Sequence, residues 1–588
     1  MQKILCQYKI NLTLYAKILV MLKKQKRGKD VSLQRTRKGE EMQSLKKKPG
    51  IERYFIVLVS LFTAVVIFSI LLIQIFFSFT QNAPTVISAN NPLLVILLFV
   101  FFLALQFGLY KLIEWSSLST KILQRILLVY SGIFGTAIAI IFFAPPMSDV
   151  WSVVNGFVVD NWITIPYTEY YPNNLGLALV YQAVFKVFGR GAWPIMYLVN
   201  IASVIGICWI IPQLTRLLHN EHSERISIQL MFFAFPYFFT VTYLYNDLIS
   251  LVLMLYAILL LFEFTKEEKS KILMLVVSGI SLGLSYILRT NTLIFLIGIG
   301  LYLVLRVIRD KKFTINHQMS FLPLVIAIIL QVSFQITAPK MIPNFTTKYA
   351  QPSISWIAMA LSDEKTMEGY KYKQPGMFND FESWAFDKYK KEHSEVTRHD
   401  FLLDIEGRKK MYHQFVSDRL SNMVRHPYET MRFFSKKEIA SWGDSSLAGN
   451  RLLMQSYEKQ KDVNEKLSKD SVALTQSIQS TALPYYEKNR DALGSPVAQF
   501  MVNTNSILNF IERPFLILTL FSTLLLLVKK RFKLDLEKFV LILIFFGGFI
   551  FHQFIWETQP RYFLSYVALL LPLSSISIST ILHRYNTK

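Results

Sequence analysis

Long apolar runs constrain this chain more than any other feature. A helix needs roughly 17 to 25 mainly apolar residues to cross about 30 Å of hydrocarbon, and stretches of this kind recur from residue 54 to residue 582. Only 18% of the 588 residues are charged, against about 25% in a typical soluble domain. The sequence therefore predicts an all-α polytopic membrane protein and disfavours a soluble multidomain enzyme. The twelve predicted spans are residues 54–79, 93–110, 122–144, 193–212, 227–243, 248–264, 272–288, 293–308, 320–338, 514–528, 538–556 and 563–582.

The distribution of positive charge predicts how these spans are oriented. The first 50 residues hold 14 Lys or Arg and only three acidic residues. Cytoplasmic segments are enriched in Lys and Arg, so we expect this tail inside the cell. Alternate loops then fall on the same side, each with two or more basic residues, whereas the loop 81–91 has no charge. We expect a multi-pass protein of the cell membrane with both termini cytoplasmic. The basic loops are 111–121, 216–225, 265–271, 309–312 and 529–538.

The net charge of +23 is concentrated in the tail and the short loops. A nucleic-acid-binding protein would instead show basic patches on a soluble surface, so no nucleic-acid partner is expected. One further apolar run, Leu175 to Gly189, is short, amphipathic and interrupted by Lys186. A crossing there would invert the charge pattern of every later loop. We therefore predict a helix lying in the outer interface.

These features divide the chain into five regions. Residues 339–513 hold 25 basic and 22 acidic residues and are long enough for a separate core. The span count places them outside the cell, and the patterns around 404–424 and 455–493 predict a mainly helical domain. The regions are a basic cytoplasmic tail (1–52), two additional transmembrane helices (53–121), a transmembrane core (122–338) with its first outer loop at 145–192, the extracellular domain (339–513), and the C-terminal transmembrane helices with a short tail (514–588).

Polar residues gather at four predicted outer boundaries where a plain membrane anchor would not need them. Each has a simpler interpretation: an isolated carboxylate can be solvated, Arg289 and Arg561 can snorkel to lipid phosphates, and the pair Tyr170-Tyr171 can belong to an interfacial aromatic belt. Their combination on one face of the bundle fits a site for a charged, membrane-borne substrate. The four segments carry Asp149, Asp160 and Glu169 with Tyr171, Asn173 and Asn174; Tyr245-Asn246-Asp247; Arg289-Thr290-Asn291; and Glu557 to Tyr562.

The motifs in this order resemble the GT-C glycosyltransferases. An outer loop opens with Asp149, the stretch Tyr171-Pro-Asn-Asn-Leu-Gly176 starts a helix that ends in Phe188-Gly189, and Arg561-Tyr562 follows near the C-terminus. The chain is most similar in these motifs to the protein mannosyltransferase and aminoarabinose transferase families and to related Gram-positive membrane proteins of unassigned role. Two segments also resemble that last group, Trp356-Ile-Ala-Met359 and Trp442-Gly-Asp444. The chain departs from the families by Asn173-Asn174 in place of paired prolines and by two extra spans.

The resemblance implies transfer of a sugar, with inversion, from a polyprenyl-phosphate donor to an acceptor outside the cell, such as a cell-wall or surface glycopolymer. A hydroxyl acceptor needs a carboxylate to take its proton, and Asp149 is the first candidate, with Glu169 and Asp160 in reserve. Negative charge accumulating on the leaving phosphate needs fixed cations. Arg561 and Arg289 are expected there with Tyr562, and we expect Asp247, Tyr171, Asn173 and Asn174 to contact substrate.

No cofactor is expected to be required. Carboxylates of Asp149, Glu169 and Asp247 could together supply oxygen ligands to Mg²⁺ or Mn²⁺, but the resemblance points to monophosphate donors, for which we expect no metal. No His and Cys cluster suggests zinc. The two cysteines, Cys6 and Cys208, suggest no disulfide framework.

Three rival functions remain at this stage. A transporter or lipid-linked-sugar flippase usually keeps ionisable groups or broken helices near the bilayer midplane, whereas the charges here cluster at the outer rim. A polysaccharide polymerase or ligase shares many spans and outer arginines, and the early loop that opens with Asp149 is the feature that separates it. A non-catalytic scaffold would not require several polar corners to converge.

Overall fold

A computed structural model provides the structure. It describes residues 50–80, 86–143, 149–158, 165–189, 192–266, 272–363, 366–367, 375–376, 378–393, 395–456, 500–501, 503 and 505–586. The chain divides into two compact units, residues 1–55 and residues 56–588. All the contacts reported for the site lie within the second unit.

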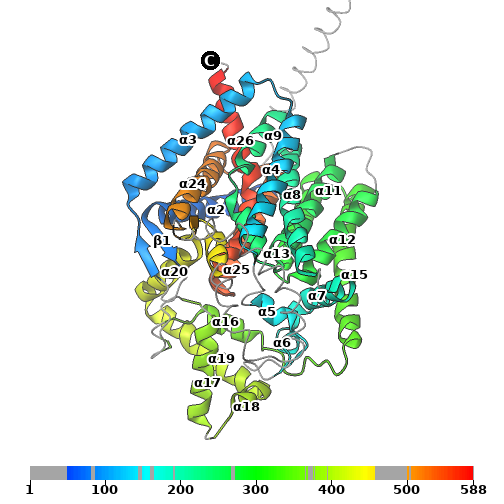
Figure 1. Ribbon diagram of the computed structural model, residues 1–588, viewed down its shortest axis with the longest axis vertical. Helices are drawn as coiled ribbons and strands as arrows, with labels where there is room; N and C mark the ends of the chain where they lie inside the picture. The colour runs from blue at the N-terminus through cyan, green and yellow to red at the C-terminus, as the bar shows by residue number, and fades with distance from the viewer. Residues whose placement is uncertain are drawn as a thin grey trace, which may run out of the picture. The chain divides into compact units, whose positions relative to one another are not determined.

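The protein is a polytopic, almost entirely helical membrane protein, as the sequence predicts. Among the described residues, ten helical segments are long and apolar enough to cross a membrane, and Figure 1 shows many of them side by side in one bundle. These segments are α2 (Ile51–Phe76), α3 (Pro92–Trp115), α4 (Thr120–Ile141), α8 (Ala192–Leu218), α11 (Asp247–Lys266), α13 (Thr292–Asp310), α14 with α15 (Ile315–Ser320 and Leu322–Thr337), α24 (Asn505–Lys529), α25 (Leu536–Phe554) and α26 (Leu564–Asn586), which follows a 3-10 turn at Pro560–Phe563.

The two remaining predicted spans have a different form. The stretch predicted as one span over 227–243 is broken: α9 (Glu221–Met231) meets the segment Phe235–Thr242, which begins with α10 (Phe235–Phe239), at an angle of 51°. Pro236 lies in the first turn of α10, where a proline starts a helix rather than continuing one. The other, α12 (Ile272–Leu288), has only 17 residues. A short antiparallel hairpin, β1 (Phe77–Thr80) and β2 (Val86–Ala89), joins α2 to α3.

Short helices follow α4 on the side of the bundle where the polar loops lie. They are α5 (Asp149–Val154), α6 (Tyr167–Tyr170), a 3-10 turn at Pro172–Asn174, and α7 (Leu175–Phe188). The helix predicted over 175–189 is thus present, and its 14 residues extend about 21 Å, too short to cross a bilayer. Gly176 allows α7 to approach α12, because a Cβ there would lie 2.2 Å from the carbonyl oxygen of Ile287.

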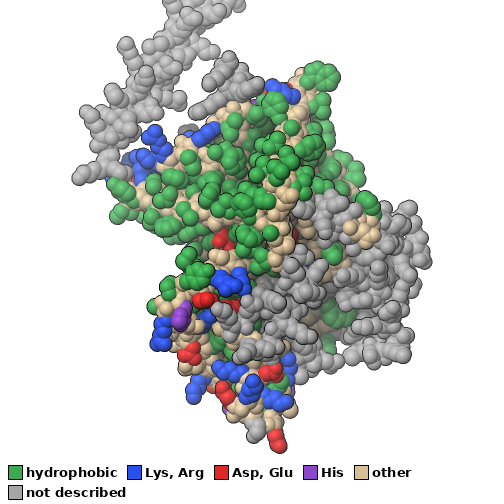
Figure 2. Space-filling model, turned by 90° about the vertical axis from the view of Figure 1, so that its left-hand side faces the viewer, with side chains coloured by type: hydrophobic (Ala, Val, Ile, Leu, Met, Phe, Trp, Pro, Cys, Tyr) green, Lys and Arg blue, Asp and Glu red, His purple; other side chains and the backbone are tan. Residues whose placement is uncertain are grey.

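The described part of region 339–513 is helical, and helix α19 covers the segment predicted at 404–424. Most of the segment predicted at 455–493 lies outside the described residues. Trp442, at the end of α20, is fully buried and packs 4.3 Å from the Phe563 ring. In Figure 2 charged side chains gather over this part, and a broad apolar surface lies beside it. The helices are α16 (Ile354–Ala360), α17 (Phe378–Glu392), α18 (Arg398–Leu403), α19 (Ile405–Arg425) and α20 (Pro427–Trp442).

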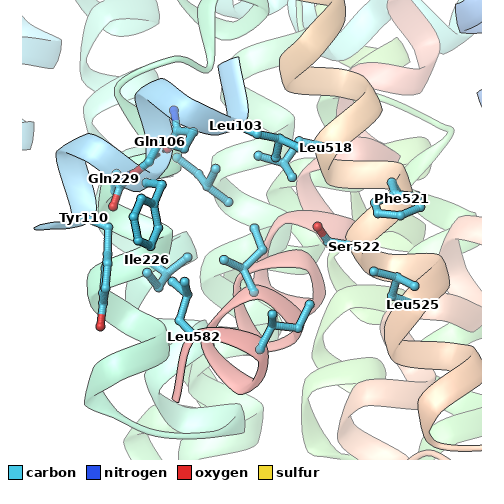
Figure 3. A pocket seen from close by; sticks show the side chains of 14 residues that line it. Leu103, Gln106, Tyr110, Ile226, Gln229, Leu518, Phe521, Ser522, Leu525 and Leu582 are labelled. Atoms are coloured by element: carbon cyan, nitrogen blue, oxygen red, sulfur yellow. Dashed lines mark hydrogen bonds between the residues drawn. The ribbon is translucent and has the colours of Figure 1, made fainter. Parts of the chain in front are cut away.

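An apolar groove of about 250 Å³ lies between α3, α9, α24 and α26 (Figure 3). Leucine, isoleucine and phenylalanine side chains form most of its wall, with Gln106, Gln229 and Ser522 among them. Arg561 precedes Ile578 of the groove wall by 17 residues, about 25 Å along a helix. The groove is therefore separate from the charged residues at the outer ends of the helices.

Candidate active site

Asp149 and Arg561 form an ion pair although 412 positions separate them in the sequence. Asp149 is the first residue of α5, where a carboxylate is favoured by the partial positive charge of a helix N-terminus. Arg561 lies in the 3-10 turn before α26, and its Nη2 donates to Asp149 Oδ2 at 2.8 Å. The Asp149 side chain is 42% exposed, whereas that of Arg561 is 9% exposed. The pair therefore joins a buried cation to an accessible carboxylate.

Three tyrosine rings surround the Arg561 guanidinium. Its carbon lies 5.1 Å from the ring centre of Tyr243, 5.4 Å from that of Tyr245 and 5.2 Å from that of Tyr562. Nη1 donates to the Tyr243 hydroxyl. Nε, although buried, has no hydrogen-bond partner among the described residues. Electron-rich ring faces stabilise a desolvated cation, so Arg561 stays charged and keeps one N–H free for a ligand.

Tyr243 and Tyr245 lie in the segment between α10 and α11, and hydrogen bonds fix this segment in place. Asn200 of α8 donates its amide to the carbonyls of Val241 and Tyr243, both at 3.0 Å. The Tyr245 hydroxyl donates to Asn174 Oδ1 at 2.7 Å. Asn174, expected from the sequence to contact substrate, is thus buried and orients a wall of the site.

Glu557 adds a carboxylate that interacts with the charge of Arg561. Its carboxylate accepts from the Gln559 amide at 2.9 Å and from the Tyr562 hydroxyl at 2.8 Å. Burial raises the pKa of Glu557, and these hydrogen bonds, together with the charge of Arg561, oppose the rise. The predicted donor-site residue Tyr562 is therefore fixed in place by Glu557.

A second guanidinium, that of Arg451, belongs to the same cluster. Its Nη2 donates to Gln559 Oε1 at 3.4 Å, and its Nε has no hydrogen-bond partner in the described part of the chain. Burial and repulsion from Arg561 both lower the pKa of Arg451. Two neighbouring cations with unused donors, in a site of low exposure, are an arrangement that a bound anion stabilises.

Arg289 and Asp247 form a separate pair. Arg289 Nη1 lies 2.6 Å from Asp247 Oδ1, and the two side chains are 8% and 2% exposed. Arg289 also lies 5.9 Å from the Tyr562 ring centre, so this tyrosine stands between the two ion pairs. Asp247 begins α11, at the tight turn that the sequence indicated. The structure encloses both residues instead of presenting them to a ligand.

The remaining predicted residues lie elsewhere or outside the described part. Glu169 accepts a hydrogen bond from the Thr346 amide at 3.4 Å, and burial raises the pKa of its carboxyl. Tyr171 is buried and donates to Glu382 Oε2 at 3.5 Å. Asn173 is half-buried in the 3-10 turn. Asp160 lies outside the described residues. Neither Glu169 nor Tyr171 is brought to the Asp149–Arg561 pair by any described hydrogen bond.

The loop that carries Asp149 is tied to the outer helices through a buried cluster. Tyr170 donates to Glu382 Oε1 of α17 at 2.7 Å and accepts a hydrogen bond from Arg408 Nη2 of α19. Arg408 is fully buried and Glu382 is 2% exposed. The Tyr170 carbonyl also accepts from the Gln351 amide at 2.9 Å. These contacts fix the end of the loop against α17 and α19.

No metal centre is formed by the acidic residues considered from the sequence. Asp149 is paired with Arg561, Asp247 with Arg289, and Glu169 contacts Thr346. Within the described ranges, no three His, Cys, Asp or Glu side chains lie close enough to hold a metal ion. The cation paired with Asp149 is Arg561.

Sequence comparison supports the resemblance to mannosyltransferases over part of the chain. Residues 174–336 match the family described as dolichyl-phosphate-mannose-protein mannosyltransferase, which confirms that resemblance for this segment. The match includes Asn174, Asp247 and Arg289, whereas Asp149 and Arg561 lie outside it. No protein of curated function matches the chain.

Two solved structures are distantly similar to the chain. The oligosaccharyltransferase AglB from Archaeoglobus fulgidus, in complex with an inhibitory peptide and a dolichol-phosphate, has a TM-score of 0.38 and 10% identity over 79% of this chain and 51% of its own. ArnT from Cupriavidus metallidurans, bound to undecaprenyl phosphate, has a TM-score of 0.30 and 11% identity over 79% of this chain and 78% of its own. This chain thus spans about half the length of AglB. With TM-scores this low, the match over 174–336 is the comparison that bears on function.

Sequence reasoning missed several residues of this region. Tyr243 and Arg451 contribute directly to the Arg561 environment, and Glu382 and Arg408 hold the loop. Tyr243 and Tyr245 come directly before the polar turn at Asp247, and this aromatic pair could have indicated the site from the sequence. The sequence around Arg451 gives no such indication, because this arginine precedes a stretch that already holds many charged residues.

Proposed function

We propose that the protein is a membrane glycosyltransferase that moves a sugar from a polyprenyl-phosphate-linked donor to an acceptor outside the cell, such as a cell-wall or surface glycopolymer. One observation carries the proposal: an accessible carboxylate, Asp149, is paired at 2.8 Å with a buried guanidinium, Arg561, that keeps an unused N–H. A base for the acceptor and a cation for the leaving phosphate thus lie side by side.

Asp149 takes the proton of the acceptor hydroxyl in this mechanism. The acceptor oxygen attacks the anomeric carbon while the bond from that carbon to the phosphate oxygen breaks, so the configuration inverts in a single displacement. Proton removal by a positioned carboxylate contributes about 10²- to 10⁴-fold to such a rate. The products are the glycosylated acceptor and the polyprenyl phosphate.

Arg561 stabilises the phosphate in this mechanism, with Arg451 as the second cation. The phosphate replaces the Asp149 carboxylate at Arg561 Nη2 and uses the free Nε, since a guanidinium matches two phosphate oxygens at once. Release from Arg561 makes the Asp149 carboxylate available to the acceptor. The two guanidinium groups supply the positive charge that stabilises the leaving group, so no metal ion is required.

The proposed orientation follows from the basic loops. With both termini in the cytoplasm, Asp149 and Arg561 face the cell exterior, where a lipid-linked donor in the outer leaflet reaches them. Glu169 and Asp160 remain reserve candidates for the base.

The test uses cells that carry Asp149→Asn or a matched control, Asp418→Asn, an exposed aspartate on α19 that accepts a hydrogen bond from Gln414. Wall polymers and lipid-linked sugars are compared by mass spectrometry. We expect Asp149→Asn to lose one sugar substituent and accumulate its lipid-linked donor, while Asp418→Asn matches the wild type. A loss of polymer chain length would instead indicate a polymerase or ligase, and donor retained on the cytoplasmic side would indicate a flippase. Unchanged glycans in a well-expressed Asp149→Asn strain would contradict the proposal.

A further inference from the structure

The turn between α19 and α20 presents apolar side chains to the outside. Leu420 and Val424 lie one helical turn apart on α19, and Tyr428 and Met431 lie within the first five residues of α20. Their exposed fractions are 50%, 81%, 76% and 69%. These four residues are called the tip surface. The two helices already have a core beneath it, formed by Leu361, Met423 and Phe433, so the tip surface is not needed to hold them together.

Basic side chains surround the tip surface. Arg425 and His426 occupy the turn itself and Arg432 follows Met431, all three exposed. Glu429 is the acidic residue among them. Apolar and aromatic side chains flanked by Arg are the composition of segments that lie in a membrane interface, where the rings and methyl groups enter the lipid and the cations meet phosphate groups.

The rest of α20 packs against the transmembrane helices α25 and α2. The Phe434 ring lies 4.9 Å from the ring of Phe554, which ends α25 and is 44% exposed. Glu438 accepts a hydrogen bond from the Ser69 hydroxyl of α2. Phe434 is only three residues from Met431, so the tip surface adjoins side chains that face the hydrocarbon.

The surface view agrees with this placement. Figure 1 places α20 beside the β1 hairpin at the left, and Figure 2 looks onto that side. Apolar side chains lie there among Lys, Arg, Asp and Glu side chains, next to the broad apolar surface of the membrane helices.

We propose that the tip surface is a membrane anchor that inserts into the outer leaflet and binds anionic phospholipid. Leu420, Val424, Tyr428 and Met431 enter the acyl boundary, and Arg425 and Arg432 bind headgroup phosphates. Continuity with the lipid-facing helices favours lipid over a second copy of the chain or a soluble partner, because either of those would have to displace lipid from Phe554 to cover the tip.

The anchor acts on the site through α19. Arg408, which holds Tyr170 of the catalytic loop, and Val424 belong to this one helix, 16 residues or about 24 Å apart. Lipid contact at one end of α19 therefore fixes the orientation of the helix that grips the loop at its other end.

The experiment uses the full chain with Cys6→Ser and Cys208→Ala, reconstituted in nanodiscs with one copy per disc. An environment-sensitive fluorophore is attached at Val424→Cys and, as a control, at Glu392→Cys, exposed at the end of α17. The discs contain phosphatidylcholine alone or mixed with phosphatidylglycerol, with or without nitroxide-labelled lipid. We expect blue-shifted emission and quenching by the nitroxide lipid at position 424 only, stronger with phosphatidylglycerol.

A charge variant separates lipid binding from misfolding. Arg425→Gln with Arg432→Gln keeps the apolar residues, and we expect the preference for phosphatidylglycerol to fall roughly fivefold per arginine. Emission at position 424 that equals emission at position 392 and is not quenched would overturn the proposal. So would a blue shift that appears only with two copies per disc, since the occupant would then be a second chain.

Discussion

Two Asp–Arg pairs lie within this site, and they differ in exposure more than in geometry. The two distances are 2.8 Å for Asp149–Arg561 and 2.6 Å for Asp247–Arg289, and each aspartate is the first residue of a helix. Asp149 is 42% exposed, whereas Asp247 is 2% exposed. A half-exposed carboxylate can exchange its partner for a ligand, but an enclosed one cannot do so without leaving a charge buried. We infer that the first pair serves chemistry and the second stability.

The largest effect is expected for Asp149→Asn. The amide cannot accept the acceptor proton, so the rate in a purified sugar-transfer assay should fall about 10²- to 10⁴-fold. The melting temperature should fall less than for Asp247→Asn, because the lost carboxylate is 42% exposed and the rings of Tyr243, Tyr245 and Tyr562 still surround the Arg561 guanidinium. A large drop in melting temperature with proportionate loss of folded protein would show that this pair, too, is structural.

Asp247→Asn should lower the stability strongly and the transfer rate little. It leaves Arg289 buried without a counter-ion, and removal of one partner of a buried pair costs about 3–5 kcal/mol. Thermal unfolding in detergent should reveal this loss, while the folded fraction keeps most of its transfer rate per molecule.

The double variant Asp247→Asn with Arg289→Gln sharpens the interpretation. It removes both charges from the same place, so it should be more stable than Asp247→Asn alone. If the double variant is no more stable and the folded protein has lost activity, Asp247 contacts substrate as the sequence suggested.

Arg561→Lys tests whether the guanidinium shape matters beyond its charge. Lysine keeps the positive charge but loses the planar fork, which binds Tyr243 together with Asp149 in the free site and, in the proposed mechanism, Tyr243 together with a phosphate. A hydrogen bond to a charged group is worth about 1.5–3 kcal/mol, so transfer should fall roughly 10- to 100-fold, chiefly through weaker donor binding. The matched variant Arg289→Lys should lower the melting temperature more than the rate. Equal activity of Arg561→Lys and wild type would argue against phosphate binding at this position.

The positions of most membrane helices along the chain could be predicted, because hydropathy indicates where a span lies. The break between α9 and α10 could not, since Pro236 stands within an apolar run that reads as one span. The β1 hairpin was also missed. Phe77–Thr80 continues the apolar character of α2, and a four-residue strand has no periodicity to separate it from the end of a helix.

The candidate site was predictable only where a charged residue stands at the end of an apolar run. Asp149, Arg561, Asp247 and Arg289 all do so, and the structure brings them together in pairs, although their chemical roles stay a prediction. Arg408 belongs to a polar helix like its neighbours in sequence, and its partner Tyr170 is 238 positions away. Such a contact depends on the packing of α19 against the loop, which no local pattern encodes.

A pH-dependent effect concerns Lys437, an enclosed cation that forms no ion pair with a carboxylate among the described residues. Its Nζ donates to the carbonyls of Ala360 at 2.9 Å and Trp556 at 3.2 Å, and burial lowers its pKa to about 7. The unfolded chain, with an ordinary lysine pKa near 10.4, binds more protons between these values. Stability should therefore rise with pH from about 7 to about 10, by at most about 1.4 kcal/mol per pH unit.

Lys437→Met should flatten this rise, because the variant carries no titrating group there. The measurement is the melting temperature in detergent across that pH range, with Lys390→Met, at an exposed position of α17, as the control that keeps the wild-type slope. If Lys437→Met kept the wild-type slope, the Lys437 ammonium would have to be solvated in the folded protein. Its surroundings, α20 and the loop at Trp556, would then be less closed than those of the Asp247–Arg289 pair.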